Sequence, residues 1–204
     1  MQIFRWAICF GLVAIITGCG GIPTREEIAD RIAAAAIESV KDANLGNNDD
    51  RTNVQVFEAA KDEVDSISNT AFDEMPTSGT ARFAGAAQLT LTPPGDGRDA
   101  RRYVGRANVG IDFASEGIVG RIDQFTRREN GRDVSGRLSI RNGDFGVNRP
   151  NDFEADYSGN LTENGNTIVV DGRMLGDFKG TPVRGLSVRH NGPDASWNGR
   201  NVDL

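Results

Sequence analysis

The stretch "YVGRANVGIDF", Tyr103–Phe113, carries an apolar or small side chain at every second position. A period of two predicts a β-strand whose two faces differ. A soluble barrel turns its apolar face inward, whereas a membrane barrel turns it outward to lipid. The direction of this face therefore separates a pore from a water-soluble module, and the rest of the chain is needed to choose between them.

The period of two continues to the end of the chain in eight segments, separated by turn-forming sequences rich in Gly, Asn, Asp and Pro. Short turns favour antiparallel neighbours in up-and-down order, and eight such strands can close into a small barrel without exposed edges. The predicted strands are 80–92, 101–114, 117–128, 133–141, 152–162, 167–178, 182–190 and 195–203. We therefore expect a mainly β fold: an eight-stranded antiparallel up-and-down soluble β-barrel over residues 76–204, preceded by an α-helical N-terminal segment.

Glycines recur on the apolar face of these segments. In "YVGRA", "IVGRI" and "VSGRL" a glycine follows a bulky residue two positions later, on the same face. Glycine weakens a strand unless its missing side chain leaves needed space. Side chains from opposite walls meet inside a narrow barrel, so large and small residues must alternate there. A lipid-facing surface has no such crowding, and the glycines therefore favour an apolar face that points inward.

The chain opens with Arg5, an apolar run from 6 to 16, small residues and Cys19. The run is too short to span a bilayer as a permanent helix and is typical of an export signal. Its end, "IITGCG", resembles the lipobox of bacterial lipoproteins. That resemblance implies a signal peptide over residues 1–18 and acylation, for example by palmitate, of Cys19. Gly20 after the cysteine resembles lipoproteins sorted to the outer membrane. An ordinary secretory signal with an incidental cysteine is the alternative.

Residues 19–75 have a helical pattern and a strong excess of acidic side chains. Thr24 and Glu27 form a capping-box sequence at the start of a first predicted helix that runs to about Asp42. The glycine- and asparagine-rich stretch 44–53 interrupts this helix. A second apolar set recurs at alternating steps of three and four, at Phe57, Ala60, Val64, Ile67 and Ala71. We expect residues 19–75 to form a helical stalk or lid in front of the barrel.

Three stretches carry a likeness to a known family: "MPTSGTARFAGAA", "RRYVGRANVGIDFASEGIVGRI" and "DGRMLGDFKGTPVRGLSVRHNGPDASWNGR". They resemble the β-barrel domain of transferrin-binding protein B and related Gram-negative surface lipoproteins, which include factor H-binding protein. The likeness covers residues 76–204. It implies a lipid-anchored eight-stranded barrel that binds another protein, in several members a host iron carrier or a complement regulator. The single barrel and the helical segment before it depart from the two-lobed receptors, so no ligand-contact residue carries over.

The sequence offers no constellation for catalysis. His190 is the single histidine, and Cys9, the other of the two cysteines, lies in the segment expected to be removed. A general base needs a positioned nucleophile and an orienting carboxylate, and a zinc site needs several imidazoles or thiolates. We therefore expect no enzyme activity, no catalytic residues, no metal and no cofactor.

Arginine is the strongest feature outside the core. Arg106, Arg121, Arg137 and Arg173 each follow a strand glycine directly, which places them on the outward face. The first three come from successive strands, so pairing close to register would align their guanidinium groups across the barrel wall. Arginine favours bidentate contacts with carboxylates and phosphates. These four residues are the predicted partner-binding set, a docking face for an acidic partner protein or for anionic lipid headgroups; a solvated wall balanced by neighbouring aspartates is the alternative.

Two functions remain open from the sequence. The first is an outer-membrane-anchored lipoprotein that binds another protein through its barrel, is held to the membrane by its N-terminal lipid, and is a monomer. Its surface could face the outside or the periplasm. The second is a lipocalin-like carrier of a small hydrophobic ligand inside the barrel, because eight strands leave room for either filling side chains or one ligand. Nucleic acid is not an expected partner of an exported chain with a net charge of −6.

Overall fold

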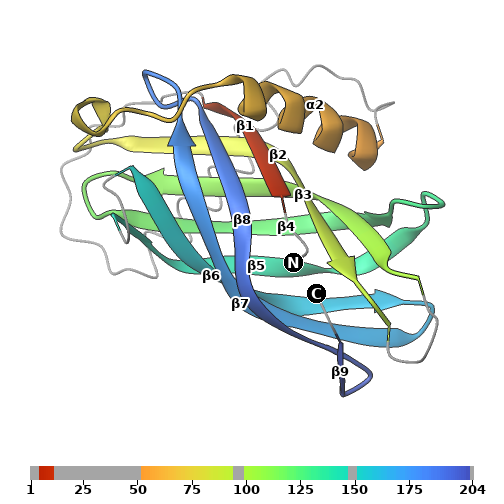
Figure 1. Cartoon of the computed structure of the whole chain (residues 1–204). Helices are drawn as coiled ribbons and strands as arrows, with labels where there is room; N and C mark the ends of the chain where they lie inside the picture. Colours follow the sequence, from red (N-terminus) through yellow and green to blue (C-terminus); the bar gives the residue numbers. More distant parts are fainter. Residues whose placement is uncertain (1–4, 12–51, 94–98, 147–150, 203–204) are drawn as a thin grey trace, which may run out of the picture.

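The computed structural model describes residues 5–11, 52–93, 99–146 and 151–202 (Figure 1). Cys19 and the first predicted helix, from Thr24 to about Asp42, lie outside the described residues. The elements in chain order are β1 (Arg5–Gly11), α2 (Asn53–Ser66), a 3₁₀ turn (Phe72–Glu74), β2 (Thr80–Leu91), β3 (Arg101–Asp112), β4 (Gly117–Arg127), β5 (Asp133–Phe145), β6 (Asp152–Glu163), β7 (Asn166–Lys179), β8 (Gly185–Trp197) and β9 (Arg200–Val202).

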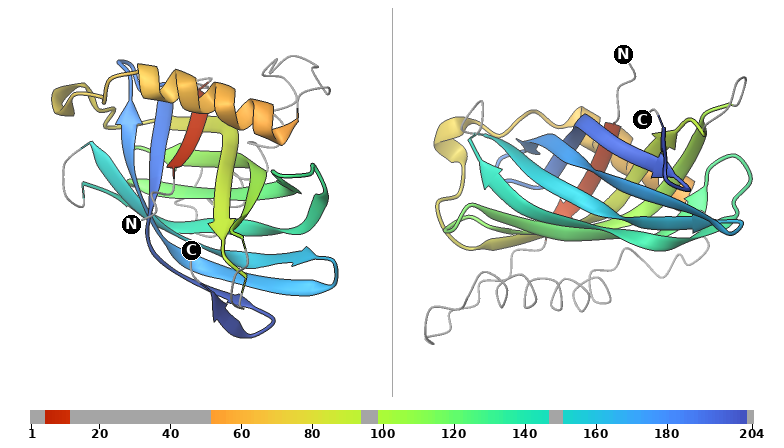
Figure 2. Two further views of the ribbon diagram at one scale, coloured as in Figure 1. Left: turned by 45° about the vertical axis from the view of Figure 1, so that its right-hand side comes forward. Right: turned by 90° about the horizontal axis from the view of Figure 1, so that it is seen from below.

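The strands form one antiparallel sheet that curves into a barrel. Each strand from β2 to β8 pairs with its neighbour in sequence, and β1 pairs with both β2 and β8. Figure 2 shows β1 between β8 and β2 at the side of the barrel that α2 covers. The expected fold class, an antiparallel up-and-down barrel of eight strands behind a helix, is confirmed.

The predicted strands 182–190 and 195–203 are wrong in detail. Residues 185–197 form one strand, β8, and only the short β9 follows it. The "NGPD" sequence between the two predicted strands is a bulge, because residues 191–194 of β8 face only 171–173 of β7. Proline cannot donate to the ladder and is tolerated at a bulge. Residues 76–204 thus supply seven long strands, and β1 is the eighth member of the ring.

The apolar face of the strands points into the barrel, as expected. Buried side chains from every strand between β2 and β8 join in one apolar cluster. Glycine makes room for large residues there: a Cβ at Gly105 would lie 2.8 Å from the ring of Phe125, and one at Gly176 would overlap the ring of Phe153. The alternating stretch Tyr103–Phe113 therefore lies mostly in β3, and its apolar face packs inward.

Helix α2 begins with a capping box in which Thr52 and Gln55 satisfy each other's backbone N–H groups. It lies along the outside of the barrel wall over β1, β2 and β3 (Figures 1 and 2). Its buried Phe57 packs on Ala86 and Val104, two residues on the outward faces of β2 and β3. An apolar patch on the outer wall therefore places the helix.

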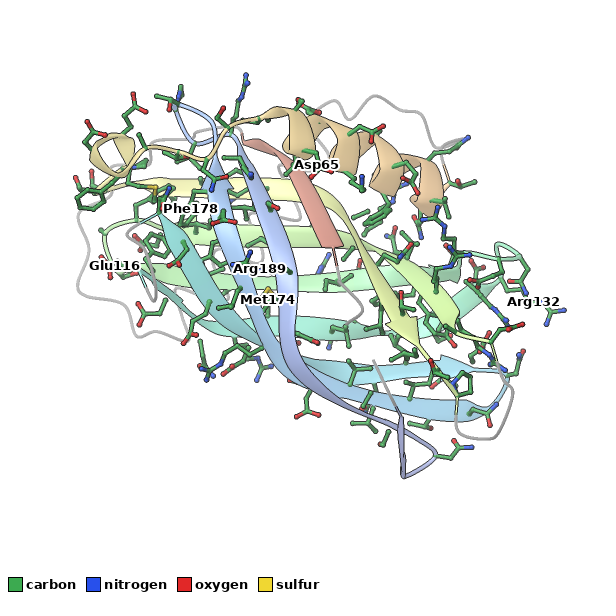
Figure 3. All side chains as sticks on the ribbon, viewed as in Figure 1. Asp65, Glu116, Arg132, Met174, Phe178 and Arg189 are labelled. Atoms are coloured by element: carbon green, nitrogen blue, oxygen red, sulfur yellow. The ribbon has the colours of Figure 1, made fainter. Side chains whose placement is uncertain are left out.

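The chain after α2 crosses one end of the barrel. Thr70 donates its backbone N–H to Phe178 O and its hydroxyl to Gly180 O, and it accepts a hydrogen bond from Asn151 Nδ2. Beneath this crossing, Phe178 packs against Phe145 with ring centroids 4.9 Å apart and against Phe153 at 5.1 Å. Phe178 and Glu116 mark this end of the barrel in Figure 3, and Arg132 marks the other.

Candidate functional site

The four predicted partner-binding arginines occupy different environments. Arg106 pairs in register with Asp123, and Arg121 pairs with Ser139 of the next strand. Arg137 is two residues from Ser139 on β5, so these three arginines fall within two register positions of each other on neighbouring strands. Arg173 lies two strands further on, opposite Asp156.

Arg106 is covered by the start of α2. Its Nε donates to Asn53 Oδ1 at 2.8 Å, and burial lowers the pKa of its guanidinium. The Asn53 amide in turn donates to the backbone oxygens of Val104 and Gln124. These carbonyls are available because β3 and β4 shift register here, and Gln124 has a φ of 53°. Arg106 therefore helps to anchor the helix instead of facing a partner.

The other three arginines lie on the outer wall. Arg121 Nε lies 3.1 Å from Asp123 Oδ2 and forms an ion pair with it. The N–H of Nε does not point at that oxygen, so Nε makes no hydrogen bond within the described part of the chain. Arg173, whose side chain is 53% exposed, lies 3.3 Å from Glu154 and 3.4 Å from Asp156. Arg137 is exposed and makes no ion pair with any described residue. Arg137 is thus the member of the set that is open to a partner.

A second charged cluster, which was not predicted from the sequence, lies inside the barrel at the end opposite Phe178. Glu163 is only 2% exposed. Its Oε2 lies 2.6 Å from Arg101 Nη1 and accepts a hydrogen bond from the Tyr103 hydroxyl at 3.0 Å, while its Oε1 is 3.3 Å from Arg127 Nη1. Glu129, nearer the solvent, pairs with Arg127 on the same rim.

The Glu163 carboxylate is held by three neighbours. Its Oε2 accepts hydrogen bonds from Arg101 and Tyr103, and its Oε1 accepts one from Arg127. Such charge-assisted hydrogen bonds are strong, so the cluster stabilises this end of the barrel. The signal that could have found it is an acid at an inward position, since Leu161 and Glu163 share one face of β6. The turn sequence "ENGN" concealed it, because acids are common in turns.

The two tyrosines of the chain give a test of this interior. Tyr103 and Tyr157 are both buried, and burial raises the pKa of each; the charge of Glu163 adds to the effect at Tyr103, and that of Asp171 at Tyr157. A raised folded-state pKa gives stability that is present below the unfolded value of about 10 and is lost as pH rises above it. We expect the absorbance at 295 nm to stay flat through pH 10 and to rise only with cooperative unfolding. A gradual titration near pH 10 in the folded protein would contradict the packing described.

The remaining predicted features belong neither to the arginine wall nor to the Glu163 cluster. His190 belongs to β8, and Cys19 falls outside the described residues. Among the described residues, no three His, Cys, Asp or Glu side chains gather as metal ligands. No helix in the described ranges is both long enough and apolar enough to cross a membrane.

Comparison with known proteins gives no relative from which to transfer a function. No family model matches the chain, and no curated protein or solved structure matches it significantly.

Proposed function

We propose that this protein is an outer-membrane-anchored lipoprotein whose barrel binds another protein through its outer surface. The anchor is the acyl group expected on Cys19. The observation that carries the proposal is the filled interior: large side chains, among them Tyr103, Phe125 and Phe153, are fully buried inside the ring. Because the inside is occupied by the protein itself, recognition is left to the outside.

The wall around Arg137 is the surface that we assign to the partner. Arg137 and Arg141 are both exposed on the outward face of β5, with Ser139 between them. Arg121 lies beside Ser139 on β4. The exposed guanidinium groups of Arg137 and Arg141 suit carboxylates on a partner's surface, because each can donate two parallel hydrogen bonds. Arg121 borders them, with its Nε 3.1 Å from Asp123 Oδ2. This surface retains the predicted Arg121 and Arg137 and adds Arg141.

The likeness to the barrels of transferrin-binding protein B supports the same class of function, a lipid-anchored barrel that engages a protein. It does not name the partner. The alternative, a carrier of a small hydrophobic ligand, would need space that the buried rings occupy. An apolar fluorescent dye separates the two functions in the full-length chain, where β1 completes the ring, since a packed barrel should not take up dye.

The decisive experiment places a photo-crosslinking amino acid at Ser139 in the full-length protein expressed in its own cells. We expect a crosslinked protein adduct whose yield falls at least about tenfold in the Arg137→Glu variant, because charge reversal opposes an acidic partner. The matched control carries the crosslinker at Glu116, an exposed residue in the β3–β4 turn at the end of the barrel. A Cys19→Ala variant should lose palmitate labelling and membrane retention.

Equal adducts from Ser139 and Glu116, or an adduct that is unchanged by Arg137→Glu, would remove the assigned surface. Uptake of apolar dye without any adduct would favour the carrier. Membrane retention of the Cys19→Ala variant in a detergent-extractable, integral form would remove the lipid anchor.

A further inference from the structure

Strand β1 has a dual position. It completes the ring between β2 and β8, which pair with β1 and nowhere with each other in the described part of the chain. Yet Arg5–Gly11 lies inside residues 1–18, the segment expected to be cut off on export. The exported chain would therefore present two strand edges that face each other across the width of one strand. We call this gap, between Phe83–Ala87 of β2 and Gly185–Arg189 of β8, the β2–β8 slot.

Direct closure of the slot is opposed by the interior. Pairing β2 with β8 would reduce the ring from eight strands to seven, and barrel diameter falls about in proportion to strand number. The interior is already in contact across the ring: the ring centroid of Phe178 on β7 lies 4.9 Å from that of Phe145 on β5 and 6.1 Å from that of Phe113, which follows β3. Close-packed side chains resist such compression. Two open edges with a fixed separation are a template for an added strand.

We propose that the exported barrel accepts an extended segment of its partner protein as a strand in the β2–β8 slot. This inference rests on the proposed function and names how the partner is held. Backbone hydrogen bonds to both edges would supply the affinity, as in other strand-addition complexes, and the side chains that line the slot would supply the selectivity.

The lining of the slot dictates an alternating sequence. Residues directly opposite each other in a sheet share a face. Inward positions of the slot are lined by Ala87 with Val188, and by Gly85 with Leu186, so large apolar side chains fit there. The outward position between them has fully buried Ala86, which Phe57 of α2 covers. Only a small side chain fits at that point. Within β1 these three register positions hold Trp6, Ala7 and Ile8.

The charge of Arg189 sets a fourth requirement on the inserted strand. Exposed Arg189 stands at the end of the slot, and β1 places Arg5 directly opposite it. Figure 3 shows Arg189 on β8. Like charges at opposite positions of a sheet are destabilising, whereas opposite charges stabilise. The best occupant therefore has an acidic residue where β1 has Arg5, followed by an apolar, a small and an apolar residue.

The chain's own remaining N-terminal part is a poor occupant. Residues 20–51 contain Pro23 and an apolar set with helical spacing, and not the alternating pattern that the slot needs. A partner segment with the acidic–apolar–small–apolar sequence is thus favoured over self-insertion.

The test uses the mature chain, residues 19–204 with Cys19→Ser, and fluorescent peptides that carry the sequence of residues 4–11 with Cys9→Ser. One peptide keeps Arg5, a second has Arg5→Glu, and a third adds Ala7→Phe to the second. We expect the Arg5→Glu peptide to bind about fivefold more tightly than the Arg5 peptide, and the preference to reverse in the Arg189→Glu protein. The Ala7→Phe change should weaken binding at least about tenfold. The full-length chain, with β1 in place, should bind none of them.

A mature chain that folds only when the Arg5→Glu peptide is added would support the inference as well. Equal affinity for the first two peptides, or no binding to a folded mature chain and no peptide-induced folding, would overturn it. Rapid formation of a disulfide in an Ala86→Cys/Ser187→Cys variant, in the absence of peptide, would also overturn the inference. With the slot open those Cα atoms are two strand spacings apart, about 9.5 Å, beyond the reach of a disulfide.

A dimer that the peptide does not dissociate would assign the slot to a second copy and also contradict the proposal. A persistent Ser139 adduct beside failed peptide binding would reject the slot and leave the proposed function standing.

Discussion

Replacement of Glu163 by alanine is expected to lower the free energy of unfolding by about 3 kcal/mol. The change removes the acceptor of two guanidinium groups and of the Tyr103 hydroxyl, all within 3.3 Å. Removal of one partner from a buried ion pair usually costs about 3–5 kcal/mol, because the charge that remains has lost both its partner and its water. The lower figure applies here, since Arg101 and Arg127 keep 21% and 24% of their side-chain exposure and can be partly rehydrated.

Urea denaturation followed by circular dichroism measures this loss. The matched control is Glu129→Ala, which removes a carboxylate from the same rim and from the same arginine, Arg127. Glu129 is 29% exposed, and surface pairs of this kind contribute at most about 1 kcal/mol. Equal losses for the two variants would mean that burial of Glu163 does not decide the energetics. The Tyr103→Phe variant isolates the hydroxyl and should cost about 1 kcal/mol.

The fold was readable from the sequence wherever one face of a strand is buried. Period-two alternation locates β2 to β7 because each strand has an inward and an outward side. It failed at "NGPD", where Gly and Pro have the same signature in a turn and in a bulge. It also could not assign Arg5–Gly11 to the ring, because a continuous apolar run predicts an export signal as well as it fits a slot between two strands.

The candidate surface was readable only in part. The glycine–arginine sequence placed Arg106, Arg121 and Arg137 on the outward face of neighbouring strands, and the register brings them together. The sequence could not show that Asn53 covers Arg106, because that contact depends on a register shift between β3 and β4 and on where α2 lands. One clue existed: Val104 is an apolar residue on the outward face, and such a residue needs a cover.

Helix α2 supplies that cover, and its docking gives the second large expected effect. Phe57→Ala should lower the free energy of unfolding by about 3 kcal/mol, the lower end of the range for a buried phenylalanine. The ring is 3% exposed and packs on Ala86 and Val104. The site is at the edge of the structure, so the loss cannot exceed the free energy with which α2 docks. Beyond that limit the helix opens locally and the barrel stays folded.

Hydrogen exchange distinguishes the two responses. We expect faster exchange of the α2 amides in Phe57→Ala and unchanged protection in β5 and β6, because the helix contacts chiefly β1, β2, β3 and β8. Phe72→Ala is the matched control: it removes the same ring from the same part of the chain, but at a position that is 67% exposed. Its effect should stay within about 0.5 kcal/mol. Uniform loss of protection across the barrel would instead make α2 an integral part of the cooperative unit. In that case the helix would be needed to hold β2 and β8 at their separation, since it is the element that spans the outer wall where β1 joins them.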